Sequence, residues 1–376
     1  MRNLATIQKI ATIVPIDGAD NIVLATMENL GWQCVIKKDE FNVGDKIIYI
    51  EIDSILPNKP EYEFLRSRNF RIRTIKLRGV LSQGLILSIE SSLGTPNIYN
   101  VGDDVTEDLG ITKYLSPAER EDIAKIEQQL KTEKNRLKKF MMRYSWFRRL
   151  FLSRNQSKGF PYWVSKTDEL RIQSLKWDSF FKQFANNIVY ISEKIDGCSG
   201  TFTGQIIPKY PFLGKLSPTK YKFVVASRNF TVNDKTSIYW KVAEKYNIEN
   251  ILKENPDLTI QGECCDTKIQ GNKYRFSDVR FFVFNVINHK TNYQFDSKEM
   301  WEFCGRYNLP VVPLLELSTL SQVGKSVDDF LSYAAKDKST LANVPREGVV
   351  IRSIEKGNKV FSFKAINNEF LLKYNE

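Results

Sequence analysis

The chain has 376 residues, of which 42% are hydrophobic and 26% charged, and its formal net charge is +11 with a pI near 9.2. This length exceeds one compact core, so two domains are expected, and the excess of cations with 12% aromatic residues favours nucleic acid over a membrane surface as partner. One histidine and five scattered cysteines argue against a histidine-based triad, a zinc site or a disulfide framework. The chain has no signal peptide pattern and no apolar run of the roughly 20 residues that span a bilayer, so a cytoplasmic or otherwise intracellular location is expected.

Residues 1–112 are predicted to form a small antiparallel β-barrel. Short β patterns separated by turns, such as 33–36 and 46–50, are typical of such barrels. Residues 70–78 alternate basic with apolar side chains, and a strand there would place Arg71 and Arg73 on one face, where they could follow phosphates. A solvated edge strand guarded by cations explains the same pattern equally well.

Residues 113–158 are predicted to form a basic helical connector. Ile123, Ile126 and Leu130 recur at helical spacing, and a run of lysines and arginines follows them. These cations could bind nucleic acid while the aromatic residues near Trp146 pack on a neighbouring domain. A solvated helix with one apolar stripe is the simpler alternative.

Residues 159–376 alternate predicted strands with predicted helices, which is typical of an α+β domain built from antiparallel sheets with flanking helices. The clearest predicted strands lie at 223–226, 258–261, 280–284 and 348–351. The helical intervals between them include 237–253 and 297–307.

The segment Glu193-Lys194-Ile195-Asp196-Gly197 places a lysine at the end of an apolar strand and before a glycine turn. A lysine held against apolar walls loses solvation, which lowers its pKa, and a neutral amine can attack an electrophile such as phosphorus. Taken alone, a lysine before Asp-Gly is more often a solvated turn residue. The rest of the chain must decide between the two interpretations.

Four later segments place charged residues where strands should turn or end: Arg228, Glu263, Glu347 and Lys364. Each alone would be an ordinary surface or turn residue. Together with Lys194, and in this order, they resemble the nucleotidyltransferase motifs of the covalent ligase and capping-enzyme superfamily. Attack of a lysine on the α-phosphorus of a nucleoside triphosphate needs a divalent cation and positive charges that follow the phosphates.

The variant of these motifs resembles one branch of the superfamily. Many DNA ligases and capping enzymes carry an arginine where this chain has Ser199, and the form seen here looks like the RNA ligase 2-like group. Lys166-Thr167-Asp168-Glu169-Leu170-Arg171-Ile172-Gln173 resembles the segment that precedes the lysine motif in those ligases. The N-terminal segments 4–10, 15–20, 31–35 and 76–85 resemble the oligonucleotide-binding (OB) domain of the Deinococcus and Naegleria type of RNA ligase.

The resemblance implies an OB domain, the connector, and a covalent nucleotidyltransferase domain of the ATP-grasp-like ligase kind. It implies a monomeric, AMP-forming ATP-dependent RNA ligase that uses Mg²⁺ or Mn²⁺ and forms a lysyl-AMP on Lys194. Its partner would be RNA, or an RNA-containing duplex, with a break between a 3′-OH and a 5′-phosphate, as in RNA repair.

The same resemblance assigns roles to single residues. Glu263 and Glu347 would hold the metal, Lys364 would contact the α-phosphate, and Arg228 would bind the ribose, the leaving pyrophosphate or an incoming 5′-phosphate end. At the nucleotide, Glu193 would contact the adenine, Phe284 would stack on one face of the base and Val350 would lie on its other face. Arg171 would contact the triphosphate tail. The remaining residues of the lysine motif, Ile195, Asp196 and Gly197, would also line the nucleotide site.

Two positions depart from the pattern. Asn285 follows the aromatic strand where an aspartate is common, and Ser362 stands where the terminal motif often has a first lysine. Two alternatives therefore remain: a capping guanylyltransferase or DNA ligase, which shares the lysine chemistry, and a catalytically inactive RNA-binding protein.

Overall fold

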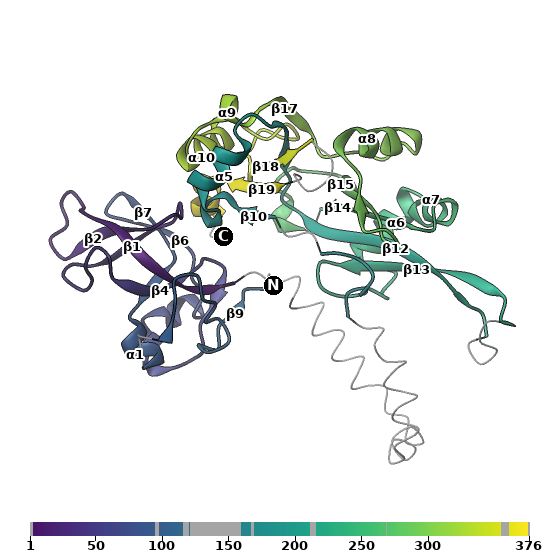
Figure 1. The fold of residues 1–376 in the computed structure, drawn as a ribbon. Helices are drawn as coiled ribbons and strands as arrows, with labels where there is room; N and C mark the ends of the chain where they lie inside the picture. Colours follow the sequence, from purple (N-terminus) through teal and green to yellow (C-terminus); the bar gives the residue numbers. More distant parts are fainter. Residues whose placement is uncertain are drawn as a thin grey trace, which may run out of the picture.

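A computed structural model describes residues 3–94, 98–115, 120, 159–166, 169–210, 216–267, 269–354 and 361–374. Most of the predicted basic connector, 113–158, lies outside these residues. The described chain is a mixed α+β protein with an N-terminal β-barrel, in purple and blue, beside a larger part that contains two sheets (Figure 1). In the described part, no helix is long and apolar enough to cross a membrane.

The N-terminal part is a nearly closed, OB-like barrel. Its five-stranded sheet has the order β3-β2-β1-β4-β8, and the pairs β5–β9 and β6–β7 complete it. The long strand β1 pairs with both β2 and β4, and a register shift between Ile10 and Thr12 bends it between the two partners. Strand β2 alternates buried and half-buried residues, as expected when one face covers the core that contains Trp32 and Tyr49. The elements of the barrel are β1 (Ala5–Pro15), β2 (Ile22–Met27), β3 (Gln33–Lys37), β4 (Lys46–Ile50), β5 (Ser54–Ile55), the 3₁₀ helix η1 (Pro60–Arg68), β6 (Thr74–Leu77), β7 (Val80–Gln83), β8 (Leu85–Leu87), α1 (Ile89–Leu93) and β9 (Thr112–Lys113).

The larger part contains two five-stranded sheets. The first has the order β10-β19-β18-β11-β17 and the second has the order β13-β12-β14-β15-β16. Their strands are β10 (Leu170–Arg171), β11 (Ile188–Lys194), β12 (Cys198–Pro208), β13 (Thr219–Ser227), β14 (Leu258–Cys265), β15 (Arg280–Asn288), β16 (Tyr293–Gln294), β17 (Leu314–Thr319), β18 (Gly348–Ser353) and β19 (Ser362–Ile366). The helices are η4 (Ile172–Ser174), α5 (Trp177–Phe184), α6 (Ile238–Lys245), α7 (Ile248–Glu254), η6 (Gln270–Asn272), α8 (Ser297–Arg306), α9 (Leu320–Val323), α10 (Val327–Lys336) and α11 (Asn368–Tyr374).

Helices cover one face of each sheet, and this leaves the other face for the site. Trp177 of α5 and Phe330 of α10 pack with Phe363 of β19 against the first sheet. Helices α6, α7 and α8 pack in the same way on the second sheet, around Phe281. Because side chains alternate across a strand, the residues next to these core positions point away from the helices.

Two sequence predictions about single elements are wrong. Residues 70–78 do not form one strand, because Phe70 has a positive φ of 58° and only Thr74–Leu77 is extended before the turn at Arg78 and Gly79. Residues 237–253 do not form one helix, because Asn247 has a φ of 52° and separates α6 from α7. Periodicity alone carries no sign of a single residue that leaves the helical region.

The barrel joins the larger part through Asp53. Its two carboxylate oxygens accept hydrogen bonds from Arg71 of the barrel (2.9 Å) and from Arg171 of β10 (3.0 Å). Nearby, the Trp32 indole N–H donates to the Ser174 hydroxyl (3.2 Å), which donates to Glu51 (2.8 Å). The contact between the two parts therefore includes a set of directed hydrogen bonds.

We expect Asp53→Asn to lower the free energy of unfolding by about 1–3 kcal/mol, because two largely buried guanidinium groups lose a charged acceptor. Asp53 has a positive φ of 67°, which asparagine tolerates, so the backbone should not add a cost of its own. Chemical denaturation measures the change. Asp39→Asn is the matched control, since Asp39 has a φ of 63° but is exposed. Equal effects of the two variants would contradict the role given to Asp53.

Candidate active site

Lys194 lies at the end of β11, against the start of β18. Lys194 pairs in register with Gly348, so the residue before β18, Glu347, lies beside the lysine side chain. The Lys194 Nζ lies 2.5 Å from Glu347 Oε1, and the two side chains are 26% and 10% exposed. The lysine side chain is therefore partly exposed, and its terminal ammonium group is ion-paired with Glu347.

The second sheet brings Glu263 to the same place. In the register between β12 and β14, Ser199 lies opposite Glu263. A Cβ atom on Gly197 would lie 2.7 Å from the Cys264 carbonyl oxygen and 2.9 Å from the Glu263 Cγ atom. Gly197 thus lets the lysine turn pass close to β14, and any larger residue would push Glu263 aside.

The charges around Lys194 correct the expectation of a lowered pKa. Burial acts to lower the pKa of Lys194, but Glu347, Glu263 and Asp196 outweigh it, so the pKa is raised. In this structure the lysine is an ammonium ion, and it needs a change in the surrounding charge before it can act as a nucleophile.

Glu263 and Glu347 have the properties of ligands for a divalent cation. Burial, together with the charges of Glu347 and Asp196, raises the pKa of Glu263 from an ordinary 4.5 to about 8, against the opposing effects of Lys194 and Arg228. The Oε2 atom of Glu347 is buried and has no hydrogen-bond partner among the described residues. A cation between the two acids would relieve both conditions.

The protein supplies few ligands to such a cation. Within the described ranges, no group of three or more acidic, histidine or cysteine side chains is placed to hold a metal ion. Mg²⁺ is commonly held by one or two carboxylates, with phosphate oxygens and water completing its shell. The pair Glu263 and Glu347 fits that pattern, provided that a phosphate-bearing ligand is present.

The residues predicted to surround the base lie on both sheets. Ile195 is buried in a small cluster with Tyr274 and Val312, and Phe284 packs against this cluster from β15. Val350 lies on β18, beside Ser192 of β11 and Lys364 of β19.

The Glu193 carboxylate accepts hydrogen bonds from the Ser339 hydroxyl (2.5 Å) and from the Thr340 backbone N–H (2.8 Å) and hydroxyl (2.6 Å). Glu193 is therefore held rigidly at the edge of the site. Its predicted contact with adenine would have to use the remaining acceptor capacity of the carboxylate or its main chain.

The predicted phosphate-binding cations have different surroundings. Arg228 follows β13 and lies near enough to Glu263 to act on its pKa, while its role at the phosphates stays a prediction. Lys364 pairs in register with Val350, on the strand next to β18. Arg171 pairs in register with Lys364, but its guanidinium group donates to Asp53 of the barrel. The described contact of Arg171 is thus a link between the domains, and its role at a triphosphate stays a prediction.

The two departures from the motif pattern have structural partners. Asn285 is fully buried and donates to Gln261 (3.0 Å) on the neighbouring strand. The Ser362 hydroxyl donates to Glu169 (3.2 Å). Both residues therefore take part in hydrogen bonds inside the protein.

Sequence reasoning missed Arg352, a buried cation on the same strand as Val350. It donates to the Phe284 carbonyl (2.9 Å) and to Glu169 (2.9 Å), so it joins β15 of the second sheet to β18 of the first. Tyr190 and Glu169 raise the pKa of Arg352, and Arg352 lowers that of Glu169, in both cases against the effect of burial. The signal was present in the sequence, because an arginine two residues after Val350 must share its face of the strand.

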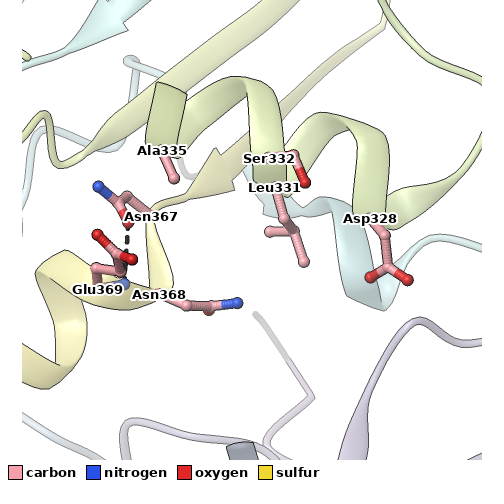
Figure 2. A pocket seen from close by; sticks show the side chains of 7 residues that line it. All are labelled: Asp328, Leu331, Ser332, Ala335, Asn367, Asn368 and Glu369. Atoms are coloured by element: carbon pink, nitrogen blue, oxygen red, sulfur yellow. Dashed lines mark hydrogen bonds between the residues drawn. The ribbon is translucent and has the colours of Figure 1, made fainter. Parts of the chain in front are cut away.

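A separate hollow of about 270 Å³ lies between α10 and the start of α11 (Figure 2). Inside it the Glu369 backbone N–H donates to Asn367 Oδ1 (2.9 Å), which caps α11. Its lining residues are Asp328, Leu331, Ser332, Ala335, Asn367, Asn368 and Glu369. None of them is a residue predicted for the nucleotide site.

Comparison with known families now identifies the domains. Residues 187–366 match the RNA ligase family model, and residues 4–89 match an OB-fold domain model. The chain therefore contains a segment similar to the RNA ligase family behind a segment similar to an OB-fold domain. The first of these ranges contains Lys194, Glu263 and Glu347, and the second contains the barrel strands β1 to β8. No curated protein sequence matches the chain.

Solved structures of the RNA ligase of Naegleria gruberi are similar to this chain. The structure with PPi has a TM-score of 0.75 and 29% identity, and the match covers 100% of this chain and 99% of that chain. A mutant with ATP and Mn has a TM-score of 0.75 and 28% identity, with full coverage of both chains. Another mutant, with AMP and Mn, has a TM-score of 0.74 and 28% identity over 98% of each chain. The predicted resemblance to the Naegleria type of RNA ligase is confirmed.

We expect Glu263→Gln to change how the stability of the protein depends on pH. Because the pKa of Glu263 rises from 4.5 to about 8 on folding, the folded state binds more protons between these values, and stability falls as pH rises through them. Glutamine does not titrate, so the variant does not lose stability in this way. The free energy of unfolding of Glu263→Gln, relative to that of wild type, should therefore increase between about pH 5 and pH 9. Denaturant unfolding across that range measures the difference.

The matched control is Glu302→Gln, at a carboxylate that is 65% exposed. Parallel pH profiles for wild type and Glu263→Gln would contradict the raised pKa.

Proposed function

We propose that the chain is an ATP-dependent RNA ligase that joins an RNA 3′-OH to a 5′-phosphate end. The observation that carries the proposal is the cluster of Lys194, Glu347 and Glu263 inside an RNA ligase domain. The strand that ends at Lys194 lies beside the strand that begins after Glu347, and Glu263 lies near enough to act on the charge of the lysine. ATP and Mn accompany the Naegleria enzyme in its solved structures, which supports ATP and a divalent cation here.

The proposed reaction has three steps. The Nζ atom of Lys194 attacks the α-phosphorus of ATP, a N–P bond forms, the bond to the bridging oxygen breaks, and pyrophosphate leaves. The RNA 5′-phosphate then attacks the same phosphorus, so AMP moves to the RNA end and Lys194 is released. In the last step the 3′-OH attacks the adenylylated 5′-phosphate, a phosphodiester forms, and AMP leaves.

The side chains around Lys194 set the conditions for the first step. The raised pKa of Lys194 means that it must lose a proton to be a nucleophile, and the negative charge of Glu347, the strongest of the charges that raise this pKa, opposes that loss. A divalent cation held by Glu263 and Glu347 would offset this charge and that of the phosphate oxygens. Arg228 and Lys364 would add positive charge along the phosphates.

Phe284 and Val350 would form the binding site for the adenine base, one on each face of the base. Stacking of a base on an aromatic ring contributes on the order of 1–3 kcal/mol, by analogy with single-strand binding. Arg352 links the strands of these two residues, because it lies on β18 and its guanidinium group donates a hydrogen bond to the carbonyl of Phe284 on β15.

Lys194→Ala and Lys194→Arg should abolish transfer of label from α-labelled ATP to the protein, because neither side chain can form the phosphoramidate. Lys290→Ala is the control, at a lysine that is 65% exposed and pairs with Asp257. Gel detection of labelled protein, with and without a chelator, is the measurement. Labelling of wild type by GTP but not ATP would favour a capping guanylyltransferase, and absence of any label would favour an inactive RNA-binding protein.

Nick sealing tests the polynucleotide substrate. We expect sealing of duplex nicks whose 3′-OH strand is RNA, with either an RNA or a DNA 5′-phosphate strand, and much slower sealing when the 3′-OH strand is DNA. Four duplexes that differ only in the strands at the nick supply the comparison. Equal rates on all four would point to a general polynucleotide ligase instead.

A further inference from the structure

Lys273 lies outside every predicted motif, yet its side chain contacts the lysine motif. It follows the short helix η6, and its ammonium group forms an ion pair with the Asp196 carboxylate. The two side chains are 11% and 4% exposed, so the pair is almost completely removed from water. The next residue, Tyr274, accepts a hydrogen bond at its hydroxyl from the Asp196 backbone N–H (2.8 Å). Two neighbouring residues therefore hold both the side chain and the main chain of Asp196.

The other side of Lys273 faces the C-terminal helix α11. Its Nζ lies 4.5 Å from the centre of the Phe370 ring and 4.2 Å from the centre of the Tyr374 ring. These rings are one helical turn apart and their centres are 4.6 Å from each other. An ammonium group near aromatic faces is stabilised as a cation, most strongly where water is excluded.

Helix α11 also reaches the acid that pairs with Lys194. The residue before it, Asn367, donates its backbone N–H to the Glu347 carbonyl (2.9 Å) and its side-chain amide to the Arg346 carbonyl (3.0 Å). The start of the helix is therefore bound to the main-chain carbonyls of two consecutive residues, Arg346 and Glu347.

The same helix is bound to the barrel. Gln83 of β7 donates to Asn368 (3.0 Å), and Leu371 is buried in the hydrophobic cluster that contains the barrel core. One helix thus contacts the OB domain, the segment of Glu347 and, through Lys273, the turn that carries Lys194.

We propose that Lys273 is a positioning residue for lysine adenylylation, holding Asp196 so that the turn keeps Lys194 directed at the nucleotide, and that α11 completes its binding site. This proposal rests on the proposed function only for its activity measurement. Lys273 acts through Asp196 and does not contact the nucleotide.

Lys273→Met should lower the single-turnover rate of lysyl-AMP formation at saturating ATP by about tenfold or more, because small misplacements of a nucleophile cost large factors in rate. The half-saturating ATP concentration should change less than about threefold, since the base and phosphate contacts are untouched. Lys273→Arg keeps the charge and can still lie against the rings, so it should retain most of the rate. Tyr374→Leu removes one ring at the end of the helix and should give a smaller loss.

Lys245→Met is the matched control. The Lys245 Nζ also pairs with a carboxylate, Asp278 (2.5 Å), and lies 5.7 Å from the centre of the Tyr246 ring, but it is remote from the lysine motif. Thermal unfolding of every variant separates lost positioning from lost folding. Amine acetylation of Lys194, followed by mass spectrometry without ATP, adds a measurement that does not need catalysis. It should be slower in Lys273→Met, because Asp196 without its cationic partner favours the protonated form of Lys194.

The outcomes are distinguishable. If wild type forms no lysyl-AMP, the proposed function fails, and the acetylation rates alone decide on Lys273. If wild type is active, a Lys273→Met rate equal to that of wild type or of Lys245→Met overturns the proposal. A loss that Lys273→Arg does not restore, or that appears only in ATP affinity, also overturns it. Should Lys273→Met fail to fold, the Lys273→Arg and Tyr374→Leu rates decide.

Discussion

The ion pair between Lys194 and Glu347 is the interaction on which the rest of the site depends. It exists because β11 and β18 are neighbours and place Lys194 opposite Gly348, next to the glutamate. A residue larger than glycine at position 348 would collide with the main chain of β19 at Ala365, so three strands approach closely just where the pair forms. The same pair keeps the lysine protonated, because the nearby carboxylates outweigh the effect of burial. A ligand that brings positive charge to these acids would lower the pKa of Lys194 and favour its neutral form.

This constraint explains why the site lies between two sheets and not on one. A single strand pair can place a lysine beside one acid, but the raised pKa of Glu263 shows that a second acid, on another sheet, lies within electrostatic reach. Each sheet buries one face under helices, so its remaining face can carry polar residues without loss of the core. Arg352 links the two sheets by a hydrogen bond to the Phe284 carbonyl. This bond holds the two sheets together where the adenine base is predicted to bind.

The sequence predicts those parts that short patterns encode. Strand alternation and the order of the charged segments were enough to place Lys194 and Glu347 at strand ends, and the structure brings them together. A single residue in the left-handed region, Asn247, divides the helix predicted over 237–253, and periodicity carries no sign of it. The direction of the Lys194 pKa was wrong for a related reason: it depends on acids distant in sequence, and burial alone gives the opposite sign. Lys273 was missed because its partners come from the lysine motif and from the last helix, and no local pattern links them.

The attachment of the barrel follows from the same geometry. Arg171 binds Asp53 of the barrel and lies in register with Lys364 of the site, while Asn368 binds the barrel directly after Asn367, which holds the Glu347 main chain. Both links therefore join the barrel to strands or segments that themselves carry site residues. Hydrogen bonds to charged and amide groups are directional, so they resist rotation of the barrel more than an apolar contact of equal area would. A displacement of the barrel would therefore act on the strand of Lys364 and on the segment of Glu347.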